Sequence, residues 1–339
     1  MQTNNINKIL IIGGEGYIGS VLCKVLLNDN ANVISYDNLI YNNHFKINEK
    51  MGYDNYRFIN GDICDNKKLD LLIRESNAVI LLAGLVGDPI SKKYPDESAL
   101  INDIGIRNVI DLCSIHNIKK FIFISTCSNY GLIENNDLAH EKYKLNPLSL
   151  YAKSKVNAEK YILSLKGKTN MNPTILRFAT AFGLSSRMRF DLTINEFAYT
   201  MSIGKELLIY DANTWRPYCH VQDFVKLIRI VLNASNDKVS FEVFNAGSTK
   251  NNATKEMIVD LLLKKLPKSK INYCKSGIDP RNYKVDFQKV KSILGFESNY
   301  SIEDGIDEIL NEIDKGTFLD VEKNKNLYGN YIINYQKPK

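Results

Sequence analysis

The fold is indicated by residues 8–28, KILIIGGEGYIGSVLCKVLLN. The apolar run KILII at 8–12 predicts a buried strand, and it leads directly into a glycine-rich turn at 13–19. The amphipathic pattern that follows predicts a helix to about Asn28. A strand, a glycine turn and a helix in this order begin a doubly wound α/β fold.

The same alternation continues through the first half of the chain. Further strands are predicted at 32–36, 56–59, 78–82, 120–125 and 174–178, and helices at 65–76, 99–116 and 149–165. This order predicts a Rossmann-type doubly wound parallel sheet with helices on both faces. Weaker strands follow near 207–210, 242–246 and 270–274. We therefore expect a Rossmann domain over 1–178, a smaller C-terminal substrate-binding domain mainly over 179–316 with some segments returning to the sheet, and a polar tail over 317–339.

Composition excludes several classes of protein. The 339 residues are 44% hydrophobic and 24% charged, as in soluble globular proteins, and no stretch of about 18 apolar residues predicts a membrane span. No signal peptide is visible, and the six cysteines and four histidines are dispersed without metal-ligand spacing. The net charge of +6 comes from scattered lysines. We expect a cytoplasmic protein with reduced thiols, no bound metal, and no nucleic-acid or membrane partner.

The glycine turn predicts a dinucleotide site. Gly13, Gly16 and Gly19 are spaced G-x-x-G-x-x-G, which allows a tight turn and close approach of a pyrophosphate to the helix N-terminus. Such a turn alone can also bind nothing. Asp37 ends the second strand eighteen residues later, where its carboxylate can accept both ribose hydroxyls and repel a 2′-phosphate. Asp62 follows the third strand, where it can meet the adenine. Together these residues favour NAD over NADP.

A tyrosine–lysine pair is the candidate catalytic feature. Of nineteen tyrosines, only Tyr151 and Tyr335 have a lysine four residues later, and Tyr335 lies at the very end of the sequence. Tyr151 and Lys155 share one helix face, just after the hydroxyl-rich segment STCSNYG at 125–131. Lys155 and the nicotinamide would lower the pKa of Tyr151 from about 10, so that tyrosinate takes a substrate proton while Thr126 holds the oxygen. The alternative is a surface helix that carries the pair by accident.

Taken together, the motifs resemble the extended short-chain dehydrogenase/reductase family, specifically its nucleotide-sugar epimerases and dehydratases, over about the first 300 residues. The segments that carry this resemblance are GGEGYIG (13–19), LLAGLVGDP (81–89), STCSNYG (125–131), YAKSK (151–155), LRFATAFG (176–183), RMRFD (187–191), RPYCHVQD (216–223), FNAG (244–247) and DPRNYKVDFQKVKSILGF (279–296). The segment LLAG stands where many relatives have an HLAA-like stretch. The motifs do not specify one sugar.

The resemblance implies a set of functional residues and an assembly. The implied catalytic residues are Thr126, Tyr151 and Lys155. The predicted NAD contacts are Gly13, Gly16, Tyr17, Ile18, Gly19, Asp37, Asn38, Asp62, Ile63, Leu82, Ala83, Gly84, Ser125, Tyr151 and Lys155. Asn102 would be a structural polar group behind the sheet. The family also implies a homodimer formed through the helices near 99–116 and 149–165.

The arginines indicate the substrate side. The chain has only nine arginines against thirty-five lysines, and Arg177, Arg187, Arg189, Arg216 and Arg281 lie in the second half, mostly in loops. Arginine presents a rigid fork that suits phosphate oxygens, although any one of these residues can instead form a surface salt bridge. The family's arginines that match Arg216 and Arg281 hold the substrate diphosphate. The predicted substrate contacts are Val86, Cys127, Ser128, Thr180, Arg187, Asn195, Arg216 and Arg281.

The implied activity is NAD-dependent oxidation at C4 of a nucleoside-diphosphate sugar. The product would be a 4-keto sugar, made by a 4-dehydrogenase (of a GDP-heptose, for example) or by a 4-epimerase, for bacterial surface-polysaccharide and capsule synthesis. Family 4,6-dehydratases keep an Asp–Glu pair after the catalytic threonine, whereas Cys127 and Ser128 follow Thr126 here, so we expect no loss of water. The alternative from another class is a non-catalytic NAD sensor or scaffold, but such proteins typically lose the tyrosine or the lysine.

Overall fold

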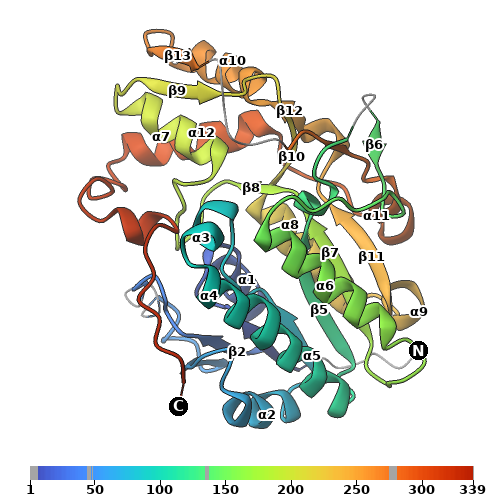
Figure 1. The fold of residues 1–339 in the computed structure, drawn as a ribbon. Coiled ribbons are helices and arrows are strands. Elements are labelled where there is room, and N and C mark those ends of the chain that lie inside the picture. The colour runs from blue at the N-terminus through green and yellow to red at the C-terminus, as the bar shows by residue number, and fades with distance from the viewer. Residues whose placement is uncertain (1–6, 44–46, 48, 134–136, 275–280, 339) are drawn as a thin grey trace.

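The protein is built on a parallel sheet of seven strands in the order β11-β7-β5-β4-β1-β2-β3 (Figure 1). The computed structural model describes residues 7–43, 47, 49–133, 137–274 and 281–338. The chain adds β2 and β3 on one side of β1 and then returns to place β4 on the other side. The gap between β1 and β4 is the topological switch point at which open α/β sheets bind ligands. The strands are β1 (Lys8–Ile12), β2 (Asn32–Asp37), β3 (Tyr56–Asn60), β4 (Ala78–Leu81), β5 (Lys120–Thr126), β7 (Pro173–Phe178) and β11 (Glu242–Ala246).

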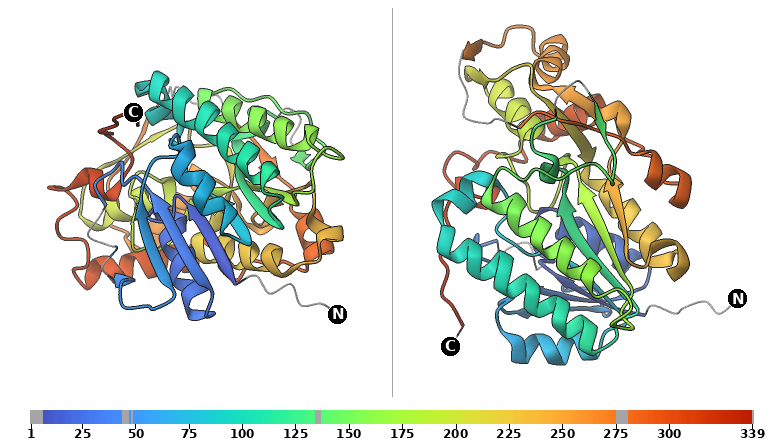
Figure 2. Two further views of the ribbon diagram at one scale, coloured as in Figure 1. Left: turned by 90° about the horizontal axis from the view of Figure 1, so that it is seen from below. Right: turned by 45° about the vertical axis from the view of Figure 1, so that its right-hand side comes forward.

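Helices cover both faces of this sheet (Figure 2). Successive side chains of a strand point to opposite faces, so Ile9 and Ile11 join one buried cluster while Leu10 and Ile12 join the other. The first cluster includes residues of α1 (Tyr17–Asn28) and α8 (Val221–Asn233), and the second includes residues of α2 (Asn66–Arg74), α5 (Ile106–Ile115) and α6 (Leu150–Ser164). The predicted Rossmann-type fold is therefore confirmed.

The predicted helix over 99–116 is not uniform. The chain forms α3 (Asp88–Lys93) and α4 (Pro95–Ser98), then a π-helical segment, η2 (Ala99–Gly105), that continues into α5. Such wide turns are rare and are often found near functional sites. Asn102 lies in this segment, directly below the loop that follows β4.

The later part of the chain forms a smaller lobe above the carboxyl edge of the sheet (Figure 1). The strands expected near 207–210 and 270–274 are β9 (Leu207–Tyr210) and β13 (Ile271–Cys274), which pair in parallel. The strand expected near 242–246 is β11, which returns to the main sheet beside β7. The other main elements here are β8 (Thr180–Phe182), β10 (Trp215–His220), β12 (Asn252–Thr254), α7 (Thr193–Ser202), α10 (Lys255–Lys265) and α12 (Ile302–Asp314). Shorter elements are η3 (Cys127–Tyr130), β6 (Leu138–Ala139), α9 (Asn236–Val239), η4 (Thr249–Asn251), β14 (Lys284–Val285), α11 (Gln288–Leu294) and η5 (Lys325–Tyr328).

The C-terminal segment packs against the Rossmann half. After α12 the chain runs back from the smaller lobe, past α3, toward β2 and α2 (red in Figure 1). Ile333 is buried in the same cluster as Ile63, and the Tyr335 hydroxyl donates to Asp62 Oδ1 at 3.2 Å. The sequence predicts a polar tail that is either packed on the surface or frayed, and the contacts of Ile333 and Tyr335 show that this part of it is packed on the sheet domain.

Across the described ranges, no helix combines the length and apolar character needed to cross a membrane. In the same ranges, no three histidine, cysteine or acidic side chains gather in a way that could hold a metal ion.

Candidate active site

A cavity of about 500 Å³ lies where the sheet meets the smaller lobe. Its wall is built from residues that directly follow the carboxyl ends of β1, β2, β4, β5 and β7, which is the edge at which ligands bind in this fold. The predicted residues that line it are Gly13, Gly16, Tyr17, Ile18, Gly19, Asp37, Asn38, Leu82, Ala83, Gly84, Val86, Ser125, Thr126, Ser128, Tyr151, Lys155, Thr180, Arg187, Arg216 and Arg281. Asp62, Ile63, Cys127 and Asn195 do not belong to this wall.

The glycine turn leaves one end of the cavity open to an anion. Gly13 has a φ of +90°, and a Cβ there would lie 2.6 Å from the Ala83 backbone nitrogen, so only glycine fits. A Cβ at Gly19 would lie 2.3 Å from the Gly13 carbonyl oxygen. Helix α1 begins at Tyr17 with no side chain capping it. Its first N–H groups and the positive end of its dipole therefore remain available to a phosphate.

Asp37 presents a carboxylate beside this turn. Its Oδ2 accepts a hydrogen bond from the Glu15 backbone N–H at 3.0 Å, and its Oδ1 accepts one from the Leu39 N–H at 2.9 Å. Burial raises the pKa of Asp37 to about 6. A fixed carboxylate next to an uncapped helix N-terminus suits the ribose and phosphate of NAD.

Asp62 supports the site from behind. Its Oδ2 accepts from Asn38 Nδ2 at 2.9 Å, and its Oδ1 accepts from the Cys64 N–H at 2.8 Å. Asn38 lines the cavity, whereas Asp62 does not. Asp62 therefore positions Asn38 in the structure. A contact between Asp62 and the adenine of NAD stays a prediction.

The loop after β4 is fixed by Asn102. This side chain is buried; its Oδ1 accepts from the Leu85 N–H at 2.9 Å, and its Nδ2 donates to the Leu85 carbonyl at 3.1 Å. Gly84 in the same loop has a φ of +156°, and a Cβ there would lie 2.9 Å from Asn102 Oδ1. Asn102 is therefore a structural group that shapes the cavity wall at Leu82–Gly84.

The three candidate catalytic residues converge on the cavity. Thr126 ends β5, Tyr151 lies in the first turn of α6, and Lys155 follows one turn later. The Ser149 hydroxyl caps α6 by accepting from the Ala152 N–H at 3.2 Å, which fixes the start of the helix. Lys155 is buried and donates to the Ile124 carbonyl at 2.8 Å.

Burial shifts the pKa values of both Tyr151 and Lys155. Burial raises the pKa of Tyr151, the charge of Asp88 raises it further, and Arg189 and a hydrogen bond with Thr126 lower it only partly. Burial also lowers the pKa of Lys155 to about 7. These shifts belong to the protein without its cofactor, so the expected lowering of the Tyr151 pKa by Lys155 and the nicotinamide together stays a prediction.

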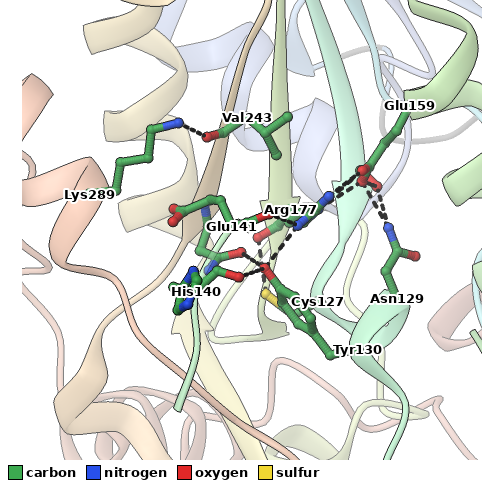
Figure 3. Close-up of polar contacts among 11 residues, drawn as sticks. Cys127, Asn129, Tyr130, His140, Glu141, Glu159, Arg177, Val243 and Lys289 are labelled. Carbon is green, nitrogen blue, oxygen red and sulfur yellow. Dashed lines mark hydrogen bonds and ion pairs between the residues drawn. The ribbon is translucent and has the colours of Figure 1, made fainter. Parts of the chain in front are cut away.

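Glu159 of α6 and Arg177 of β7 form a buried ion pair beside β5, the strand that ends at Thr126 (Figure 3). Arg177 Nη2 lies 2.6 Å from Glu159 Oε2, and Arg177 Nε lies 3.1 Å from both carboxylate oxygens. Ser125 Oγ and Asn129 Nδ2 also donate to Glu159, at 2.5 and 2.8 Å. Cys127 belongs to this layer, since its thiol donates to the Arg177 carbonyl at 3.2 Å and burial raises its pKa. The network therefore holds the residues on both sides of Thr126.

Two predicted substrate contacts lie behind the wall. Cys127, the first residue of η3, does not line the cavity, and its thiol donates to the Arg177 carbonyl instead. Asn195 is fully buried; its Nδ2 donates to the Tyr17 hydroxyl at 3.2 Å and its Oδ1 accepts from the Gly183 N–H at 3.0 Å. Asn195 therefore positions Tyr17, which does line the cavity.

The predicted diphosphate arginines lie together. Arg216 Nη1 donates to the Trp215 carbonyl at 2.7 Å and to the Arg281 carbonyl, and its guanidinium lies 5.1 Å from the centre of the Tyr283 ring. Arg281 Nη1 lies 2.6 Å from Asp88 Oδ2. Arg187 lies apart from them, 4.8 Å from the centre of the Tyr41 ring, with its charge acting on Asp37.

Sequence reasoning missed part of the cavity wall. Asp88 and Tyr283 stand inside the quoted motifs LLAGLVGDP and DPRNYKV, so their position was a usable signal. Tyr41, Asn330 and Tyr331 also line the cavity. Nothing in the polar tail marks Asn330 and Tyr331 as wall residues, because only the fold brings the tail to this site.

Known proteins share this architecture. The sequence model of the NAD dependent epimerase/dehydratase family matches residues 9–247. A putative UDP-glucose 4-epimerase of Methanocaldococcus jannaschii is 30% identical, over 89% of this chain and 97% of its own. The crystal structure of UDP-glucuronic acid 4-epimerase from Bacillus cereus with UDP-glucuronic acid and NAD matches with a TM-score of 0.81 and 26% identity, over 91% of this chain and 99% of that one. A dTDP-glucose 4,6-dehydratase from Bacillus anthracis, in complex with NAD, matches with a TM-score of 0.80 and 25% identity, over 91% and 96%.

Proposed function

The chain belongs to the NAD dependent epimerase/dehydratase family, and from that premise we propose that it oxidises C4 of a nucleoside-diphosphate sugar without removing water. The observation that carries this proposal is the convergence of Thr126, Tyr151 and Lys155 on the cavity that also contains the glycine turn and Asp37. NAD, when bound, supplies the hydride acceptor. A sensor or scaffold on the same fold has no need of this tyrosine–lysine pair.

The protein's own groups move the proton. The Tyr151 hydroxyl, as tyrosinate, accepts the proton of the sugar hydroxyl at C4, and Thr126 holds that oxygen by a hydrogen bond. Burial raises the pKa of Tyr151, so the tyrosinate needs a nearby cation. Lys155, whose Nζ lies 5.9 Å from the centre of the Tyr151 ring, supplies this charge when it is protonated.

The residues near Thr126 favour oxidation without dehydration. Elimination of water from C5 and C6 needs a poised acid and a base. Cys127 is buried away from the cavity with a raised pKa, and Ser128 carries only a hydroxyl, 3.3 Å from the Tyr283 hydroxyl. The Asp88 carboxylate also lines the cavity, with its Oδ2 paired with Arg281 and its Oδ1 without a hydrogen-bond partner, but a single carboxylate does not supply both the acid and the base.

We propose that Arg216 and Arg281 hold the substrate diphosphate. Both line the cavity, and a contact between Arg216 Nη1 and the Arg281 carbonyl joins their segments. A 4-epimerase and a net 4-dehydrogenase, for example of a GDP-heptose in bacterial surface-polysaccharide or capsule synthesis, both fit this chemistry.

The helices near 99–116 and 149–165 are proposed as a homodimer interface. They carry large apolar side chains at the surface: Ile104, Ile115, Leu150 and Leu163. Light scattering after gel filtration should give twice the mass of one chain. The Ile115→Lys variant should have the mass of a single chain. A wild-type mass of one chain would contradict the proposed dimer.

The activity is tested with a panel of UDP-, GDP- and dTDP-sugars. Absorbance at the NADH band reports net oxidation, and NMR of the sugar reports inversion at C4. The Tyr151→Phe variant is the control, because it removes the proton acceptor and keeps the cavity. Turnover of no sugar nucleotide by the wild type, despite bound NAD, would contradict the proposed function.

A further inference from the structure

Three buried side chains on one side of the cavity have polar atoms without hydrogen-bond partners. Within the described part of the chain, Tyr41 Oη, Arg187 Nε and Asn330 Oδ1 have no partner. The three residues are only 9%, 3% and 9% exposed, and all of them line the cavity. A buried polar atom without a partner costs free energy, so such a cluster indicates that a ligand completes it.

The cluster has the chemistry of a ribose-phosphate site. Arg187 has no carboxylate at ion-pair distance among the described residues, whereas neighbouring Arg189 is paired with Asp191 at 2.5 Å. Burial lowers the pKa of Arg187 to about 10, so its guanidinium remains charged at neutral pH. The Arg187 N–H and the Tyr41 hydroxyl are donors for phosphate oxygens, and Asn330 Oδ1 can accept from a ribose hydroxyl.

The cluster lies on the cofactor side of the cavity. Tyr41 follows Asp37 by four residues, and the charge of Arg187 acts on the Asp37 carboxylate. The loop that carries Arg187 is fixed to the start of α1, because the Ser185 hydroxyl donates to the Tyr17 carbonyl at 2.6 Å and the Tyr17 hydroxyl donates to the Gly183 carbonyl at 2.5 Å. Arg187 therefore stands close to the helix N-terminus that attracts a diphosphate.

The C-terminal segment brings Asn330 to this cluster. Arg187 Nη2 donates to the Gly329 carbonyl at 3.1 Å, and the Asn330 N–H donates to Asp191 Oδ2 at 3.2 Å. Asn330 Nδ2 donates to the Val86 carbonyl at 3.3 Å, which joins the segment to the loop after β4.

Further along, the segment is held first by α3 and then by Asp62. Lys93 donates to the Tyr331 carbonyl at 3.0 Å, Ile333 is buried, and the Tyr335 hydroxyl reaches Asp62 at 3.2 Å. Asp62 in turn holds Asn38 in the cavity wall. The segment 329–335 therefore runs from the loop after β4, where Asn330 contacts Val86, to Asp62, which follows β3 (Figure 1). Asn330 and Tyr331 of this segment line the cavity.

We propose that Tyr41, Arg187 and Asn330 form a subsite for the diphosphate bridge of NAD, and that the segment 329–335 is a strap that keeps the cofactor bound. The subsite reassigns Arg187 from the substrate to the cofactor. Release of NAD then requires the strap to undock. The inference rests on NAD binding and not on oxidation at C4.

The subsite is tested by calorimetry with NADH, ADP-ribose and adenosine. Arg187→Met should weaken the binding of NADH and of ADP-ribose by about 10- to 100-fold, because a hydrogen bond to a charged group is lost. The affinity for adenosine should stay unchanged. Asn330→Ala should also weaken the binding of NADH. If Arg187→Met instead weakens the binding of GDP and UDP and leaves the affinity for NADH unchanged, the subsite belongs to the substrate and the proposal is overturned.

The strap is tested by stopped-flow release of NADH into excess NAD. Ile333→Ser removes the buried apolar anchor and should raise the release rate by about tenfold. Leu319→Ser is the matched control, since Leu319 lies in the same C-terminal region with 86% of its surface exposed, and it should release NADH at the wild-type rate. Equal release rates for Ile333→Ser and the wild type would overturn the strap. These readouts contain no sugar nucleotide, so they are independent of the proposed activity.

Discussion

Removing one partner of the buried Glu159–Arg177 pair should destabilise the protein strongly. The two side chains are 2% and 5% exposed, and four donors converge on the Glu159 carboxylate: two nitrogens of Arg177, Ser125 Oγ and Asn129 Nδ2. Glu159→Gln keeps the shape but leaves a buried guanidinium without a counter-charge. Breaking such a pair costs about 3–5 kcal/mol, which is a large part of a typical free energy of unfolding of about 5–15 kcal/mol.

Urea unfolding followed by far-UV circular dichroism measures this cost. The matched control is Glu297→Gln, because Glu297 and Lys291 form an ion pair at 2.6 Å with both side chains more than half exposed. The control should leave the urea midpoint nearly unchanged, because solvent screens an exposed ion pair. The double variant Glu159→Leu/Arg177→Met should be more stable than Glu159→Gln, since it buries no unpaired charge. If Glu159→Gln costs no more than Glu297→Gln, the reasoning is refuted.

Three further predictions concern the catalytic pair and Asp37. Tyr151→Phe should lower kcat by about 10²- to 10⁴-fold with the Kd for NADH unchanged, and turnover within tenfold of the wild type would remove Tyr151 from its role. Asp37→Ala should bring the affinities for NAD and NADP closer together, and a wild type that already prefers NADP would contradict this. Because burial raises the pKa of Asp37 to about 6 and ribose hydroxyls bind the ionised carboxylate, NADH affinity should rise about tenfold from pH 5 to pH 7.5. Asp37→Asn should show no such dependence in a fluorescence titration.

The Rossmann half could be predicted from sequence because its signals are local. Each predicted strand there is a short apolar run that ends at a turn, and the glycine spacing identifies the first turn without knowledge of the rest. The strand near 242–246 was also visible as a pattern, but its pairing with β7 was not, because pairing joins segments far apart in the sequence. The expected fold class is therefore confirmed, and the topology adds what local patterns cannot give.

The site itself could be predicted only in part. Thr126, Tyr151 and Lys155 were identified because their spacing follows from one strand end and one helix face. Whether Cys127 and Asn195 face the cavity depends on side-chain direction, which their motifs do not reveal. The raised pKa of Tyr151 depends on burial and on Asp88, a neighbour from another loop.

The mass of the product decides whether the protein oxidises C4 without removing water. The purified protein is incubated with NAD and the sugar nucleotide that it turns over, and the product is examined by mass spectrometry and NMR. We predict either the loss of two hydrogens, from net oxidation at C4, or an unchanged mass with inverted configuration at C4. A product that has lost one molecule of water would contradict it, because the residues after Thr126 provide no acid and base for that elimination.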